Sequence, residues 1–265
     1  MGVLALACLC LAYAQTAEAG AWNQAEGRWL LISSGVYNEA ALAYDEDSQP
    51  VIPVSFQKIE HAVYAEYGLS KRLTLVGKGA IQDVRYTSSA GPQNFTGFST
   101  SKIGVRIGLK KRGAWAMSVQ PSVVIPAGGE GIPDGDLGIG GYGIEMRALA
   151  GRSVNFGKFS GFIDGQIAYE KRGGGAPQQV SADVTVGINP SPRIQILGQG
   201  FLNRTNNAVV EARDPVLENR SLKLQLSAVY RFNDRTSLQV GGFRSAAGKN
   251  IVREQGGLVS LWTEF

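Results

Sequence analysis

The stretch 101–110, SKIGVRIGLK, alternates apolar and polar positions along its whole length. The odd positions in Ile103–Leu109 are apolar, whereas Lys102, Arg106 and Lys110 occupy even positions. A helix would spread these charges around its circumference, but an extended strand puts the two sets on opposite faces. The stretch therefore predicts a β-strand with one apolar face and one charged face.

The same alternation recurs along the chain, and we count about twelve such segments. Each can supply the roughly 9–11 tilted residues that cross a bilayer, whereas strands of a soluble sandwich usually have about 5–6. The expected segments are 28–42, 54–68, 72–86, 97–110, 114–126, 136–149, 157–171, 179–189, 193–205, 219–232, 235–245 and 254–265.

The connections between these segments alternate in length. Short turns are expected at 68–71, 111–113, 150–152, 189–192 and 232–235. Longer polar loops are expected at 45–50, 87–96, 127–136, 172–178, 206–218 and 245–253. An even-stranded outer-membrane barrel with periplasmic termini requires this alternation, and a soluble β-domain does not. The sequence predicts an all-β fold: a single antiparallel up-and-down transmembrane β-barrel of about twelve strands, with periplasmic termini, in the cell outer membrane.

The first nineteen residues predict a signal peptide, so that the barrel would comprise residues 20–265. Val3–Tyr13 is a short apolar run, and Ala17–Ala19 has the small-x-small pattern of a cleavage site. The alternatives are a buried N-terminal helix or strand, and a lipoprotein signal around Cys8 or Cys10, for which the flanking residues fit poorly. Cleavage would remove both cysteines, so the mature chain would have no disulfide.

Charge and composition exclude several functions. The formal net charge is +4, and it becomes +5 when Glu18 is removed with the signal peptide. Basic residues are scattered, so we expect no nucleic-acid binding. We also expect no cofactor and no metal. Acidic residues in 45–47 and 130–136 could hold Ca²⁺ or Mg²⁺, but solvated loops explain them as well.

The C-terminal segment 258–265 alternates and ends on Phe265. A final strand that ends on an aromatic residue resembles the assembly signal of bacterial outer-membrane proteins. The expected partners are therefore the barrel assembly machinery, outer-membrane lipid and lipopolysaccharide. Aromatic residues near other predicted strand ends indicate interface girdles: Trp29, Tyr44, Tyr67, Tyr86, Trp115, Tyr169, Tyr230 and Phe232.

Two short segments carry a family resemblance. Tyr64–Leu75, YAEYGLSKRLTL, is similar to a strand-turn-strand segment of the MetA-pathway phenol-degradation or transporter-like outer-membrane proteins, and Asp134–Gly138, DGDLG, resembles a loop of theirs. The resemblance implies an outer-membrane barrel that takes up small molecules. It supplies no functional residues to transfer.

If the apolar residues face lipid, the opposite set faces the lumen. The candidate lumen and selectivity residues are Lys58, Glu60, Glu66, Lys78, Lys102, Arg106, Lys110, Glu145, Arg147, Asp164, Glu170, Asp183, Arg193, Lys223 and Arg231. They could line a water-filled path or form salt bridges that block it. A count of about twelve strands does not distinguish an open lumen from a blocked one. Because basic residues outnumber acids along strands such as 101–110, we also expect a weak anion preference.

The single histidine, His61, tests an enzymatic interpretation. Its same-face neighbours in the segment are Ile59 and Val63, so no serine or acid lies beside it within the strand. We expect no enzyme. The predicted function is a channel or porin for passive diffusion of small solutes whose identity the sequence leaves open. The alternatives are a plugged structural or surface-loop binding barrel and, third, an outer-membrane hydrolase.

Overall fold

The computed structural model describes residues 20–88, 91–109, 113–130, 141–174, 176–206 and 218–265. The predicted signal peptide and Lys110 lie outside these ranges. Within them, no helix has the length and apolar character needed to cross a membrane.

In the described residues the chain forms fifteen strands joined in a single sheet. They are β1 (Trp29–Tyr44), β2 (Ile52–Ser70), β3 (Leu73–Ser88), β4 (Gly91–Phe98), β5 (Ser101–Gly108), β6 (Trp115–Ile125), β7 (Gly128–Glu130), β8 (Gly143–Phe156), β9 (Phe159–Arg172), β10 (Gln179–Ser191), β11 (Ile194–Thr205), β12 (Asn219–Arg231), β13 (Thr236–Lys249), β14 (Ile251–Val252) and β15 (Gln255–Glu264).

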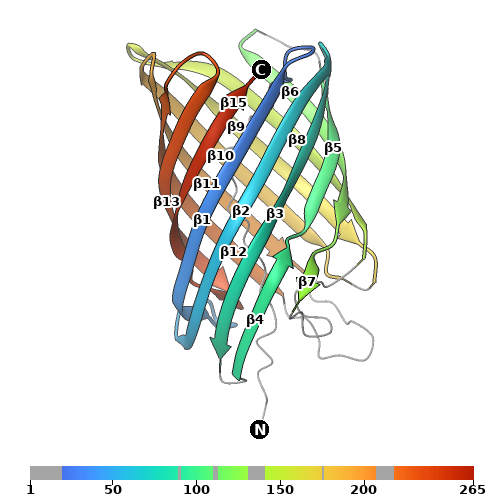
Figure 1. The fold of residues 1–265 in the computed structure, drawn as a ribbon, viewed down its shortest axis with the longest axis vertical. Coiled ribbons are helices and arrows are strands. Elements are labelled where there is room, and N and C mark those ends of the chain that lie inside the picture. The colour runs from blue at the N-terminus through green and yellow to red at the C-terminus, as the bar shows by residue number, and fades with distance from the viewer. Residues whose placement is uncertain (1–19, 89–90, 110–112, 131–140, 175, 207–217) are drawn as a thin grey trace.

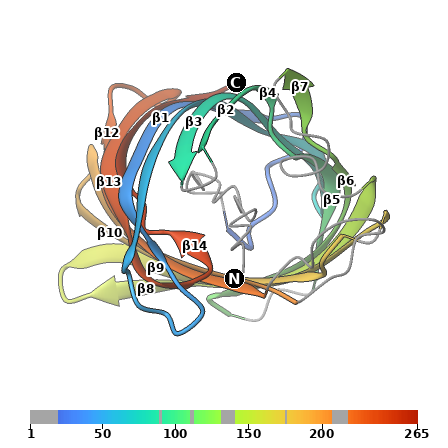
Figure 2. The same cartoon turned by 90° about the horizontal axis from the view of Figure 1, so that it is seen from below.

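The sheet closes on itself as a barrel. All neighbouring strands are antiparallel, and β1 pairs with β2 on one side and with β14 and β15 on the other. β4 with β5, β6 with β7, and β14 with β15 each form one interrupted strand of the wall, so the wall has twelve strands. Figure 1 shows their steep tilt, and Figure 2 shows the ring from below. The predicted up-and-down barrel is confirmed, and closure pairs the first strand of the wall with the last along β1 and β15.

Three predicted connections are wrong. The expected turn at 150–152 lies inside β8, where Gly151 pairs with Asp164, and the chain turns at Gly157, whose φ of 62° suits glycine. The expected loops at 87–96 and 245–253 are largely strand, because β3, β4 and β13 continue past the predicted ends. Cross-strand pairing extended these strands through residues whose composition is typical of loops.

Both ends of the barrel wall lie at the end with the short turns. The backbone N–H of Trp29 donates to the carbonyl of Phe265 at 2.7 Å, which joins the start of β1 to the end of β15. In outer-membrane barrels the short-turn end is periplasmic. The wall strands therefore begin and end on the predicted side.

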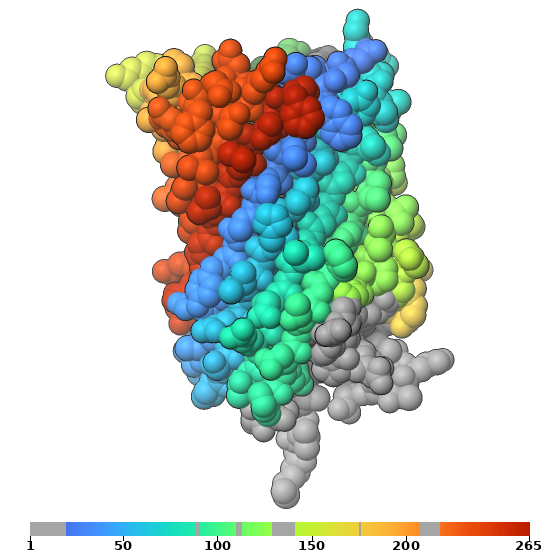
Figure 3. Space-filling model, in the orientation of Figure 1, coloured from blue at the N-terminus to red at the C-terminus, as the bar shows by residue number. Residues whose placement is uncertain are grey.

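The side chains alternate across the wall as the sequence predicts. In β5, Ile103 and Ile107 are exposed on the outer face, whereas Lys102 and Arg106 are buried inside. Further apolar side chains exposed on the outside include Ile59, Leu224 and Leu226 among others, and Figure 3 shows one face of this closed surface. A continuous apolar exterior around a polar interior is typical of a barrel surrounded by lipid.

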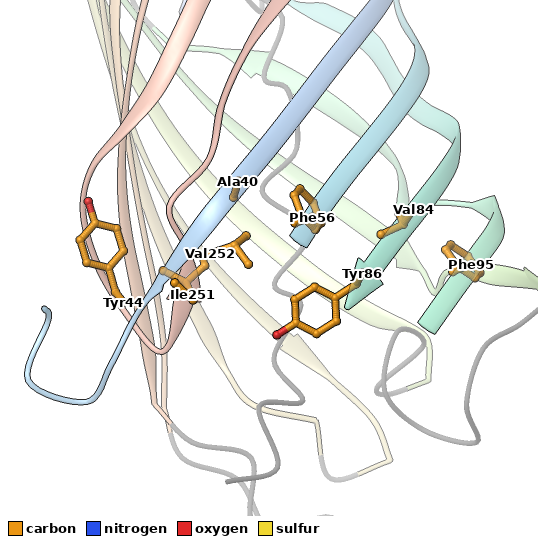
Figure 4. Packing of buried hydrophobic residues seen from close by; sticks show 9 residues of the cluster. Ala40, Tyr44, Phe56, Val84, Tyr86, Phe95, Ile251 and Val252 are labelled. Carbon is orange, nitrogen blue, oxygen red and sulfur yellow. The ribbon is translucent and has the colours of Figure 1, made fainter. Parts of the chain in front are cut away.

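Aromatic rings gather at the short-turn rim. Trp29 lies between Tyr67, with ring centroids 4.6 Å apart, and Phe265, at 6.5 Å. The prediction that Tyr44 and Tyr86 belong to an interface girdle is wrong. Both side chains are buried inside the barrel, at the end with the long loops. There they belong to an apolar cluster, drawn in Figure 4, of Ala40, Ala43, Tyr44, Phe56, Val84, Tyr86, Phe95, Ile251 and Val252.

Candidate functional site

The lumen is the candidate site, because most of the predicted residues lie in it. Lys58, Glu60, Glu66, Lys102, Arg106, Glu145, Arg147, Asp164, Glu170, Asp183 and Lys223 are all buried on the inner face. Lys78 is half-buried there, while Arg193 and Arg231 are exposed at the short-turn mouth. The structure thus brings twelve of the fifteen residues into the barrel interior and leaves two at its mouth, while Lys110 lies outside the described residues.

A first set of charges spans β5, β8, β9 and β10. Lys102 pairs with Glu145 and with Glu170, and Arg147 pairs with Glu145 at 3.2 Å and with Asp183 at 2.8 Å. Arg172 also pairs with Glu170. We call these six residues (Lys102, Glu145, Arg147, Glu170, Arg172 and Asp183) the acid–base network. It joins β8, β9 and β10, which are neighbours, to β5, which lies beyond β6 in the wall.

Arg106 forms the second set and is fully buried. Its Nη1 lies 2.7 Å from the carboxylate of Glu66, its Nε donates to Gln120 at 3.1 Å, and its Nη2 donates to the Tyr64 hydroxyl at 3.0 Å. Tyr64 in turn donates to Glu66. One guanidinium therefore joins β2, β5 and β6 with almost no access to water.

A third set lies under the seam between the first and last strands. Lys223 pairs with Glu254 at 2.8 Å and lies 4.8 Å from the ring centre of Phe243. Asn38 donates to the same Glu254 at 3.2 Å, and Lys58 pairs with Glu60 at 3.1 Å. Glu254 was not among the candidates, although it is the first residue of the predicted strand 254–265, because the clear alternation of that strand begins only at Leu258.

The three sets change the interpretation of lumen charge. Lys58, Lys102, Arg106, Arg147 and Lys223 each have an acidic partner, which lies on another strand in every case except the same-strand pair of Lys58 and Glu60. The local excess of positive charge along individual strands, on which the predicted anion preference rests, is neutralised by pairing. The side chains that are predicted to line a water-filled path therefore form ion pairs with one another.

Residues 20–28 enter the lumen ahead of β1, and Figure 2 shows this segment inside the ring of strands. We call it the N-terminal segment. Ala21 N–H donates to Asp164 at 2.8 Å, Arg106 donates to the Trp22 carbonyl at 3.0 Å, and Gln24 N–H donates to Thr74 at 2.9 Å. The sequence reasoning treated these residues only as the start of the mature chain, since nothing in their composition shows that they fold inward.

The segment lies against the wall where a glycine leaves space. Trp22 packs over Gly151 of β8, and a Cβ at Gly151 would lie 2.5 Å from the indole ring. The ring also meets Phe162 edge-on, with centroids 5.9 Å apart. The contacts of the segment run from β2 to β9, so it covers about half of the ring of strands and leaves the other half open.

We expect Gly151→Val to release the N-terminal segment. Overpacking of this kind costs about 1–3 kcal/mol, so the equilibrium constant between the bound and the released segment should shift about tenfold or more toward release. An increased current through single molecules in a planar bilayer would show the release. Gly165→Ala is the matched control, because a Cβ at Gly165 meets nothing within 4 Å. An unchanged current in Gly151→Val would mean that Trp22 does not obstruct the path.

Two cavities lie on either side of the charged middle. A cavity of about 1670 Å³, which we call the vestibule, opens at the short-turn end, and one of about 420 Å³ lies at the long-loop end beside Phe56 and Glu254. Between Lys102, Glu145 and Arg147 the structure leaves about 10 Å³, roughly the volume that one water needs. Of these three cavities, the ones at the two ends are large and the one beside the acid–base network is the smallest.

His61 lies on the lipid-facing side of β2, where it is exposed. Its Nε2 is 3.5 Å from the hydroxyl of Ser33 on β1, a contact at the limit of a hydrogen bond. No acid contacts this pair within the described part of the chain. A hydrolase site needs a base close to its nucleophile, a group that orients the base, and access to water. The lipid around the middle of the barrel wall supplies none of these.

The acidic loop at 45–47 has a structural explanation. The Asp45 carboxylate accepts backbone N–H groups from Asp47 at 3.0 Å and from Gln49 at 2.7 Å, which closes the turn between β1 and β2. Asp134 and Asp136 lie outside the described residues. Within those residues, no group of three His, Cys, Asp or Glu side chains could hold a metal ion.

A closed twelve-stranded wall with an apolar exterior, aromatic rim and charged interior defines the class: a transmembrane β-barrel of the bacterial outer membrane.

Comparison with solved structures agrees with this class. The chain is similar to an outer membrane channel from Pseudomonas putida F1, with 13% identity, a TM-score of 0.68 and coverage of 95% of this chain and 100% of that one. It is also similar to the translocator domain of the autotransporter NalP from Neisseria meningitidis, with 12% identity, a TM-score of 0.54 and coverage of 91% and 90%. At these identities the similarity shows the fold. No family model and no curated protein sequence matches the chain.

Proposed function

We propose that this protein is a narrow outer-membrane channel for small polar or amphiphilic solutes, and that the N-terminal segment restricts its path. The observation that carries the proposal is the wide vestibule, which leads from the short-turn end to the charged middle, where the smallest of the three cavities lies. The likeness to an outer membrane channel, and the resemblance of Tyr64–Leu75 to the MetA-pathway and transporter-like barrels, support uptake rather than catalysis.

The attachment of the N-terminal segment supports a path that can widen. Hydrogen bonds hold its backbone to Asp164, Arg106 and Thr74, and no covalent link to the wall is present in the described residues. Net hydrogen bonds of this kind contribute about 0.5–1.5 kcal/mol each, and somewhat more when one partner is charged. Such a segment can leave the lumen without unfolding the barrel, whose strands are held by their own ladder.

Single-channel recording tests the proposal. We expect the wild type to conduct weakly and the deletion of residues 20–26 to conduct at least about threefold more, because the deletion removes the backbone and side chains that contact the inner wall from Thr74 to Asp164. Electrophoretic mobility of unheated samples would report whether the deleted form still folds. A folded deletion variant that carries no current would overturn the channel and support the plugged barrel.

A further inference from the structure

The vestibule lies against the half of the ring that the N-terminal segment leaves open. Strands β8 to β13 and β15 form its wall, and Trp22 of the N-terminal segment forms part of its inner boundary. Its volume of about 1670 Å³ exceeds the roughly 300–1,000 Å³ of common small-molecule sites. It opens at the short-turn end, which is the periplasmic end of the barrel.

The deep part of the vestibule is apolar. Leu197 and Val229 are buried and pack with Phe162 and Trp262, and Trp22 meets Phe162 edge-on. A surface of indole and aliphatic groups of this kind favours binding of the apolar body of a ligand. Each Å² of apolar surface removed from water contributes about 25 cal/mol to the free energy of binding.

The mouth of the vestibule is basic. Arg193, Arg231 and Arg235 follow one another at the short-turn ends of β11, β12 and β13, and all three contribute to the lining. Arg231 donates to the Pro192 carbonyl at 2.9 Å, but none of the three guanidinium groups forms an ion pair with any described carboxylate. In contrast, Lys58, Lys102, Arg106, Arg147 and Lys223 in the middle of the lumen each form an ion pair with a carboxylate.

The remaining charges of the mouth refine its preference. Arg152 lies over the outward-facing Trp115 ring at 5.4 Å and Lys158 over the Phe159 ring at 5.3 Å, and both also contribute to the lining. Asp234 and Glu264 line the vestibule as well. Five cations and two carboxylates leave a net charge of +3 at the mouth, which favours anions.

We propose that the vestibule is a binding site for an amphipathic carboxylate, with the carboxylate at Arg193, Arg231 and Arg235 and the apolar body between Trp22, Phe162 and Trp262. Arginine donates two parallel N–H groups to a carboxylate, and this geometry selects it over a neutral hydroxyl. Binding here does not require the lumen to conduct, so the site stands apart from the channel proposed above.

Tryptophan quenching by a brominated ligand tests the site. The chain has four tryptophans, and Trp29→Phe with Trp115→Phe leaves only the two of the vestibule, Trp22 and Trp262. In phosphatidylcholine nanodiscs, we expect 11-bromoundecanoate to quench them saturably, at least about tenfold more tightly than 11-bromoundecanol, which corresponds to 1.4 kcal/mol. The alcohol enters a neutral bilayer more readily, so lipid partitioning alone would give the opposite order.

Substitution of the arginines at the mouth is the second part of the test. The triple variant R193Q/R231Q/R235Q should lose the tenfold preference for the carboxylate, and each single substitution should weaken carboxylate binding by about twofold to threefold, equal shares of that tenfold on a logarithmic scale. R72Q, in the exposed turn between β2 and β3 at the same end but outside the lining of the vestibule, should bind as the parent does. Equal quenching by acid and alcohol, or a carboxylate preference that survives in the triple variant, would overturn the proposal. Absence of current in planar bilayers would leave it unaffected.

Discussion

Replacing Arg106 with methionine is expected to lower the free energy of unfolding by about 3–5 kcal/mol, the usual cost of breaking a buried ion pair from one side. Arg106 is fully buried and lies 2.7 Å from the equally buried carboxylate of Glu66. Without the guanidinium, this buried carboxylate loses the ion pair that neutralises it, and Gln120 loses its donor. Equilibrium unfolding in urea, followed by tryptophan fluorescence in lipid vesicles, measures the change.

A double variant separates charge from packing. Removing both partners in R106M/E66L should restore most of the stability, because no charge is then left alone in the interior. Arg231→Met is the matched control: this arginine is exposed at the mouth, and we expect a change below about 1 kcal/mol. If Arg106→Met cost no more than the control, water would have to reach the site, contrary to its burial.

Replacing Lys102 with methionine is expected to make the channel prefer cations by about tenfold. Lys102 neutralises Glu145 and Glu170 beside the smallest of the three cavities, so its loss leaves one uncompensated negative charge there. Two unit charges 4 Å apart interact by about 4 kcal/mol at an effective dielectric constant near 20, so a tenfold effect, 1.4 kcal/mol, needs only part of this energy. Reversal potentials in a KCl gradient measure the preference.

The opposite substitution sharpens this test. Glu145→Gln leaves positive charge at the same place and should shift the reversal potential toward anions. Lys171→Met serves as the control, since Lys171 follows Glu170 in β9 but is exposed on the outer face. Shifts of the same sign in Lys102→Met and Glu145→Gln, or none in either, would mean that permeating ions do not pass the acid–base network.

The sequence by itself determined the barrel, because period-two alternation in 101–110 is a local property of the chain. A strand that faces lipid on one side and a lumen on the other must alternate, and burial in the structure follows this pattern at Ile103, Lys102, Ile107 and Arg106. The same alternation by itself indicates which residues face the interior of the barrel. The position of turns such as the one at Gly157 could not be predicted from local composition, because pairing between strands extends β8 past the expected turn.

Tertiary structure alone decided which charges meet and what fills the lumen. Lys102 meets Glu145 and Glu170 from strands 43 and 68 residues further along the chain, and only strand order and register bring them together. The N-terminal segment carries no periodic pattern, so its inward path depends on Asp164, Thr74 and the space over Gly151. Alternation fixes the face on which a side chain lies, but closure of the ring fixes its partners, because these lie across a lumen that no local pattern describes.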